Sequence, residues 1–124
     1  MNEHEFRQRT KQLALRVIRV AQALPNNLIA EVISRQIVKS GTSVGANYRA
    51  ACRAKSTADM IAKLQIGEEE ADETLYWLEL IIEAKLLDEE LLQPLIQETD
   101  EITAMVVSSI RTLQASQPTR KSKI

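Results

Sequence analysis

Apolar residues recur at steps of three and four positions along almost the whole chain. This spacing places them on one face of an α-helix. In the first half of the chain, the positions on this face are Phe6, Leu13, Val17, Ala21 and Leu24, then Ile29, Ile33, Ile37, Val44, Tyr48 and Ala51. In the second half they are Ile61, Leu64, Ala71, Leu75, Leu78 and Ile82, then Leu92, Leu95, Ile102, Met105, Val106, Ser109 and Leu113. The pattern predicts four amphipathic helices.

Short polar signals separate these helices. Pro25 and the two asparagines after it end the first helix, residues 3–24, and begin the second, residues 27–54. Ser56 is followed three positions later by an acid, in the manner of a capping box, and therefore opens the third helix. Asp88 is a natural N-cap for the fourth helix.

Long helices joined by connections of a few residues pack most simply as an up-down-up-down bundle. The sequence therefore predicts an all-α fold, an antiparallel four-helix bundle made by residues 1–113. Residues 114–124, QASQPTRKSKI, contain no apolar stripe and are predicted to be a flexible basic C-terminal tail.

Residues 40–56, SGTSVGANYRAACRAKS, hold two of the chain's three glycines within the predicted second helix. In a hairpin of the second and third helices, Gly45 lies opposite Gly67, and Gly41 opposite Ala71. Glycine inside a helix costs about 1 kcal/mol relative to alanine, so a compensating gain is expected. We predict a close crossing of the second and third helices at these four residues. A phosphate-binding loop is disfavoured, because GTSVGAN lacks the G-K-[ST] ending and follows no strand.

Composition narrows the classes of function. No apolar run approaches the roughly 18 residues of a membrane span, and the charged N-terminus lacks the apolar region of a signal peptide, so we expect a cytoplasmic protein. Cys52 is the only cysteine and is interpreted as a small buried hydrophobic residue rather than a nucleophile. The acids between Glu68 and Glu73 are interpreted as a solvated or salt-bridging face, since no Glu-x-x-His motif accompanies them. We expect no metal, no cofactor, no small-molecule substrate and no catalytic residue.

Charge divides the chain into two halves. Residues 1–55 hold ten Lys and Arg against three Asp and Glu, whereas residues 56–113 hold three against fourteen. On the second helix, four cations fall within an arc of about 80° opposite the apolar face, and they form a basic ridge. This basic ridge consists of Arg35, Lys39, Arg49 and Arg53. It could bind nucleic-acid phosphates, which requires only clustered positive charge.

The alternative is that the basic ridge is a solvated face, or that it pairs with the acidic third helix. Lys39 stands near the height of Asp72 and Glu73, and Arg53 stands near Asp59. Ionic pairs of this kind would make the cations part of the protein's own packing, and both interpretations stay open at this point.

Adjacent aromatic residues indicate a second apolar surface. Tyr76 and Trp77 cannot both face the interior of one helix bundle, and Leu80 also lies off the predicted buried face. We predict that Tyr76, Trp77 and Leu80 contribute to a contact between subunits.

Residues 36–80, QIVKSGTSVGANYRAACRAKSTADMIAKLQIGEEEADETLYWLEL, closely resemble the four helix bundle protein family, also called the 23S rRNA intervening-sequence protein family. Its relatives include the accessory variability-determinant proteins of diversity-generating retroelements. The resemblance implies an antiparallel four-helix bundle that assembles into a homopentamer. It also implies an uncharacterised role, with nucleic-acid binding proposed for retroelement relatives whose surfaces are strongly basic. This chain departs from them in its pI of about 5.9.

These observations together predict a non-enzymatic homo-oligomer, a pentamer by the resemblance, that contacts RNA or DNA through the basic ridge. The alternative is a protein-interaction scaffold without nucleic-acid binding, in which the cations pair with acidic helices of the same or neighbouring subunits.

Overall fold

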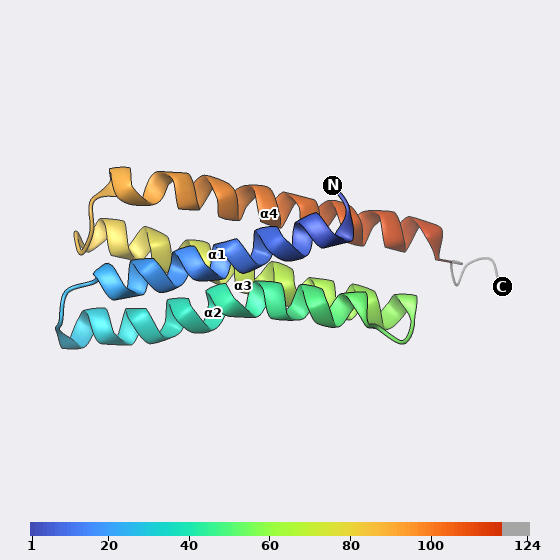
Figure 1. Ribbon diagram of the computed structural model, residues 1–124, viewed down its shortest axis with the longest axis horizontal. Helices are drawn as coiled ribbons and strands as arrows, with labels where there is room; N and C mark the ends of the chain where they lie inside the picture. Colours follow the sequence, from blue (N-terminus) through green and yellow to red (C-terminus); the bar gives the residue numbers. More distant parts are fainter. Residues whose placement is uncertain (118–124) are drawn as a thin grey trace.

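The computed structural model describes residues 1–117 and contains four α-helices in that range. They are α1 (Glu3–Ala23), α2 (Leu28–Cys52), α3 (Thr57–Glu83) and α4 (Glu89–Ser116). Successive helices run antiparallel and form an elongated bundle (Figure 1). Packing is extensive between α1 and α2, α2 and α3, and α3 and α4, whereas α1 and α4 touch only along a thin seam. The predicted all-α four-helix fold is confirmed.

Side-chain caps set where three of the helices begin. The Asn2 side chain accepts a hydrogen bond from the Glu5 amide at 2.8 Å, and Ser56 Oγ accepts one from the Asp59 amide at 3.0 Å. Asn27 Oδ1 accepts one from a third amide, that of Ala30, at 2.9 Å. Each cap satisfies a backbone donor that has no partner inside its helix.

The C-terminal helix is longer than predicted. Asp88 occupies the N-cap position of α4 as expected, although its side chain makes no capping hydrogen bond. The helix continues to Ser116, three residues beyond the predicted end of the bundle. Residues 118–124 of the predicted tail lie outside the described residues.

The core is a single apolar cluster to which all four helices contribute. Its fully buried members include Leu13, Ile37, Leu78 and Ile102. The predicted buried faces are correct in outline, with shifts of one position. Ile29 is 60% exposed and Ala30 is buried in its place, while Ile81 rather than Ile82 is fully buried on α3. Neighbouring helices select which edge of a wide apolar stripe is covered, and this selection depends on their packing angles.

The predicted glycine crossing joins the wrong pair of helices. A Cβ atom on Gly41 would lie 2.7–2.9 Å from the Val17 side chain of α1, and one on Gly45 would lie 3.1 Å from Thr10 Oγ1. Both glycines therefore face α1, not α3. A Cβ on Gly67 would meet α2 at ordinary contact distances, 3.8 Å from Asn47 Cβ and 3.9 Å from a backbone oxygen.

The prediction was wrong because it matched residues only by their level along the bundle. Matching residue numbers across a hairpin gives their level along the bundle, but it does not give the direction in which each residue points. On α3, Ala71 is fully buried as expected of a packing residue. The residue of α2 that bonds across to α3 is Ser40, whose Oγ lies 2.9 Å from Thr74 Oγ1.

Candidate nucleic-acid interface

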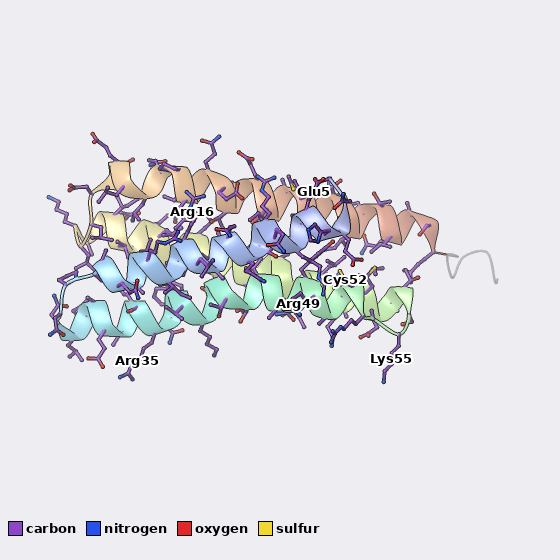
Figure 2. The ribbon with its side chains drawn as sticks, viewed as in Figure 1. Glu5, Arg16, Arg35, Arg49, Cys52 and Lys55 are labelled. Carbon is purple, nitrogen blue, oxygen red and sulfur yellow. The ribbon has the colours of Figure 1, made fainter. Side chains whose placement is uncertain are left out.

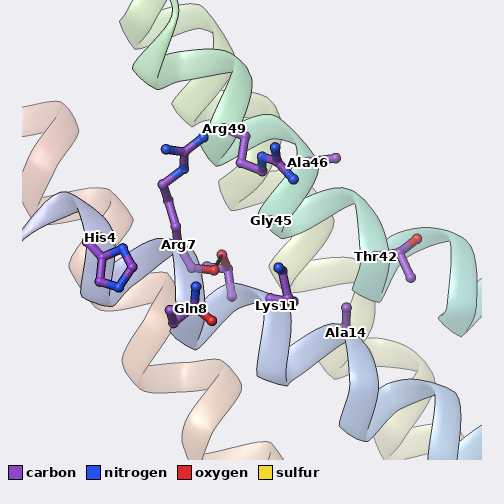
Figure 3. A pocket seen from close by; sticks show the side chains of 10 residues that line it. His4, Arg7, Gln8, Lys11, Ala14, Thr42, Gly45, Ala46 and Arg49 are labelled. Atoms are coloured by element: carbon purple, nitrogen blue, oxygen red, sulfur yellow. Dashed lines mark hydrogen bonds between the residues drawn. The ribbon is translucent and has the colours of Figure 1, made fainter.

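A basic groove runs between α1 and α2 on the outside of the bundle (Figure 3). We call it the α1–α2 groove. It has a volume of about 430 Å³ and is lined by His4, Arg7, Gln8, Thr10, Lys11, Ala14, Thr42, Gly45, Ala46 and Arg49. The two antiparallel helices supply opposite walls, so residues distant in sequence share one surface.

Small residues make room for the groove. Ala14 on α1 and Gly45 with Ala46 on α2 carry at most a methyl group, so these three positions leave space between the helix backbones. Arg7 and Lys11 lie one helical turn apart on α1, about 6 Å along the axis. Figure 3 shows them and Arg49 of α2 directed into the same space.

The positive charge of the groove is largely uncompensated. None of its lining residues, all of them within the described chain, is acidic. Arg7 lies 3.8 Å from Glu3, one turn earlier on α1. Lys11 and Arg49 are exposed and form no ion pair within residues 1–117. Such a concentration of cations attracts anions.

The basic ridge predicted on α2 lies beside this groove. All four of its residues are exposed, and Arg49 belongs to both surfaces. Figure 2 places Arg35 near the beginning of α2 and Arg49 near its end. Arg35 pairs with Glu31 of its own helix.

The pairs that the alternative interpretation expected within one subunit do not form among residues 1–117. Lys39 and Arg53 have no acidic partner there, and Asp59 instead lies 3.9 Å from Lys63 on its own helix. The geometric reason is that the basic ridge faces outward from α2, away from α3.

Sequence reasoning missed the contribution of α1 to the site. Arg7, Lys11 and His4 were not singled out, because the pattern was read along one helix at a time. The excess of Lys and Arg over Asp and Glu in residues 1–55 could have indicated a basic contribution from α1. This helix supplies five Lys and Arg against two Asp and Glu.

The opposite side of the bundle is acidic. The α3 helix contains eight Asp and Glu against one Lys, and α4 contains five against one Arg. Ion pairs between the basic and acidic halves of the described chain are confined to Arg9. Its guanidinium donates to both carboxylate oxygens of Glu98 at 2.7 Å and to Glu101 Oε1 at 2.7 Å. Hydrogen bonding to Glu98 raises the pKa of Arg9, so the pair closes the thin α1–α4 seam as a fixed ionic clamp.

Comparison with known proteins identifies the family. The family model described as 23S rRNA-intervening sequence protein matches residues 2–108. The chain belongs to this family. It is also similar to a crystal structure of a protein of unknown function from the S23 ribosomal protein family of Bacteroides thetaiotaomicron VPI-5482. The two are 38% identical with a TM-score of 0.80, over 85% of this chain and 97% of the other. A comparison with curated proteins finds no match.

In this member of the 23S rRNA-intervening sequence protein family, the adjacent residues Tyr76 and Trp77 differ in exposure. Tyr76 is 53% exposed, whereas Trp77 packs against the core and its indole N–H donates to Glu73 at 3.3 Å. Leu80 is half-buried. Of the three predicted interface residues, Tyr76 therefore offers the most free surface.

Further aliphatic residues are exposed where one end of the bundle begins. Leu28, Ile29 and Val32 are exposed on the first turns of α2, and Leu91 is exposed on the first turn of α4. Both helices start at the same end of the molecule (Figure 1). We call these four residues the apolar end surface; they lie on two helices that are not neighbours in the bundle, and the sequence analysis did not predict their exposure.

Cys52 sits at the other end of the bundle, beside Tyr48. It is half-buried rather than fully buried. Burial raises the pKa of the Cys52 thiol above its ordinary value and also raises the pKa of Tyr48. A raised thiol pKa lowers the thiolate fraction at neutral pH, which is the opposite of what a nucleophile needs.

The structure contains no candidate metal site within residues 1–117, where no three His, Cys, Asp or Glu side chains come together. None of the helices in that range is long and apolar enough to cross a membrane.

Proposed function

We propose that this protein is a non-enzymatic, cytoplasmic homo-oligomer that binds the phosphates of RNA or DNA. The binding surface is the α1–α2 groove, extended along α2 by the basic ridge. No catalytic residue, cofactor or small-molecule substrate is assigned to it.

One observation carries this proposal: Arg7, Lys11 and Arg49 converge on a groove that no acidic residue lines. Coulomb attraction to a phosphate is strongest where cations cluster without internal partners. The ridge residues Lys39 and Arg53 are also exposed and unpaired within residues 1–117, and they lengthen the positive surface along α2. The acidic α3 and α4 explain how a chain with a pI of about 5.9 can still present one basic face.

A salt titration tests phosphate binding. A fluorescently labelled RNA stem-loop, which contains paired and unpaired nucleotides, is titrated with protein at several salt concentrations. Affinity should fall steeply as salt rises, because each phosphate contact releases counterions. Arg49→Glu should weaken binding by roughly tenfold, since it reverses a charge in the groove.

Arg19→Glu is the matched control. Arg19 is an exposed arginine of α1 that does not line the groove, so its reversal changes net charge equally. If both variants lose the same affinity, the effect of Arg49→Glu is one of net charge and not of the groove. If the wild type does not bind at low salt, the proposal is wrong.

Assembly into a homo-oligomer is supported by the apolar end surface and by Tyr76. Exposed apolar patches on a small protein commonly mark contacts between proteins. We propose a pentamer, as the family resemblance implies. Light scattering at micromolar concentration measures the assembly. Ile29→Lys should shift it toward smaller species without lowering the melting temperature of the fold, and a wild-type monomer would contradict the proposal.

A second candidate function follows from the charge separation between the two hairpins. In a protein-interaction scaffold, the acidic α3 and α4 of one subunit would occupy the α1–α2 groove of the next. Arg49→Glu would then reduce assembly, and added salt would dissociate the oligomer in the absence of any nucleic acid. An oligomer that keeps its size in Arg49→Glu would exclude this form of scaffold.

A further inference from the structure

The α1–α2 groove has no Phe, Tyr or Trp side chain, and its single aromatic ring is the imidazole of His4. The chain contains one Phe, two Tyr and one Trp, and all four lie within the described residues. Phe6 and Tyr48 pack edge to face at 4.6 Å, with Phe6 buried in the core. Tyr76 and Trp77 belong to α3, which supplies no lining residue of the groove. Unpaired bases therefore find only one small ring, that of His4, to stack on in this groove.

The two hydroxyl groups in the groove are already engaged by the helices that carry them. The Thr10 hydroxyl donates to the Phe6 and Arg7 carbonyls of α1, each at 3.1 Å. The Thr42 hydroxyl donates to the Val38 carbonyl of α2 at 2.7 Å. These hydroxyl protons are not available to base acceptors, which leaves Gln8, His4 and the three cations as the polar groups that face a bound nucleic acid.

The helix backbones that carry the cations are held in a fixed arrangement. Both walls are long α-helices, and the approach of α1 and α2 at Gly41 and Gly45 leaves little freedom for one wall to slide on the other. Arg7 and Lys11 lie about 6 Å apart along one wall. A duplex presents its phosphates in an equally fixed array, whereas a flexible single strand must first be ordered at an entropic cost.

We infer that the α1–α2 groove selects base-paired nucleic acid over unpaired strands. This inference rests on the proposed function and specifies its ligand as the phosphate array of a duplex. Proteins that bind single strands without sequence preference gain much of their affinity by stacking successive bases on aromatic rings, and this groove offers only the imidazole of His4.

The test compares three labelled ligands of equal length and matched sequence at one salt concentration: an RNA duplex, a DNA duplex and an unpaired RNA strand. At least one duplex should bind more tightly than the unpaired strand by roughly tenfold or more. The two duplex arms distinguish A-form from B-form geometry, and a preference for either supports the inference. An unpaired strand that binds as tightly as both duplexes would overturn it while leaving the proposed function intact. Absence of binding by all three would overturn both.

Variants connect the preference to the groove. The logarithm of the duplex binding constant falls linearly with the logarithm of the salt concentration. Lys11→Gln and Arg49→Gln should each make this slope shallower by about one unit, because each variant loses one phosphate contact. Arg19→Gln, outside the groove, should leave the slope unchanged. Slopes that change equally in all three variants would place the duplex elsewhere on the molecule and would overturn the inference.

A gain-of-function variant tests the physical cause. Gln8 is exposed in the groove, so Gln8→Trp introduces a large aromatic ring of a kind that the groove lacks. It should tighten binding of the unpaired strand several-fold and narrow the gap to the duplex. If the unpaired strand binds no better to this variant, the preference for duplexes does not come from a lack of rings for base stacking. The inference would then be wrong about the physical cause that it gives.

Discussion

The α2 helix meets its two neighbours through different kinds of contact. Toward α1 it presents Gly41 and Gly45, where an added methyl group would come within 3.1 Å or less of α1 side chains. Toward α3 it presents Ser40, bonded to Thr74, and it faces Gly67 across an ordinary contact distance. Glycines in similar helical settings thus have unlike roles, and the neighbouring atoms decide which role each one has.

The largest effect should come from filling the α1–α2 contact. Gly41→Leu places a branched side chain where even a Cβ would lie 2.7 Å from Val17, so α1 must move outward. We expect a loss of about 3 kcal/mol or more in the free energy of unfolding, measured by urea denaturation. Gly41→Ala should also lower the free energy of unfolding, but by less.

Gly67→Ala is the matched control for that contact. Its Cβ finds room against α2, and alanine favours the helix, so stability should stay equal or rise by up to about 1 kcal/mol. A loss in Gly67→Ala as large as that in Gly41→Ala would remove the distinction between the two contacts.

A smaller effect is expected where α1 meets α4, since that seam depends on one ionic clamp. Arg9→Met leaves Glu98 and Glu101 without their shared partner and should cost about 1–2 kcal/mol in urea denaturation. Arg19→Met is the control, because Arg19 forms no ion pair within residues 1–117 and should change stability little. Equal values in the two variants would show that the clamp contributes nothing.

The polar contact between α2 and α3 should contribute less. Thr74→Val keeps the volume but removes the hydroxyl that lies 2.9 Å from Ser40 Oγ, and we expect a loss of about 1 kcal/mol in thermal or urea unfolding. Thr103→Val is the comparison, since its hydroxyl bonds only to the Thr99 carbonyl of the same helix at 2.8 Å. A Thr103 variant that is the less stable of the two would contradict a specific role for the contact between helices.

The smallest effect concerns pH at the end of α2. Burial raises the folded-state pKa of Cys52, so the unfolded chain loses its thiol proton first as pH increases past 9.0, the ordinary value. Above that pH the folded state binds more protons than the unfolded state, and stability falls. The decline in unfolding free energy between pH 8 and pH 10 should be shallower in Cys52→Ala. An identical decline in that variant would exclude a contribution from the thiol.

The helices and their boundaries followed from local chemistry. Asn27 and Ser56 cap the helices that they were expected to open, and the stretch from Ser40 to Cys52 is helical rather than a phosphate loop. The need for close packing at Gly41 and Gly45 was also foreseen, because glycine in a helix carries a cost that must be offset. The partner helix was wrong, because number matching along one hairpin gives no rotational angle.

In the candidate site, too, some residues could be predicted from one helix and others only from the packing of two. Arg49 was predicted from its place on α2, whereas Arg7 and Lys11 become relevant only when α1 lies alongside. A basic ridge can be read from one helix. A groove requires two helices, their separation and the small residues between them.

The sequence by itself determined the number of helices, where each begins, the apolar face of each in outline, and the split of charge into a basic and an acidic half. These properties depend on neighbours within a few positions along the chain. Only the tertiary structure decided that Gly41 and Gly45 meet α1, that cations from two helices share a groove, and that Arg9 closes the seam with α4. Such contacts depend on how each helix is rotated about its axis, and that rotation is set by the packing of all four helices together.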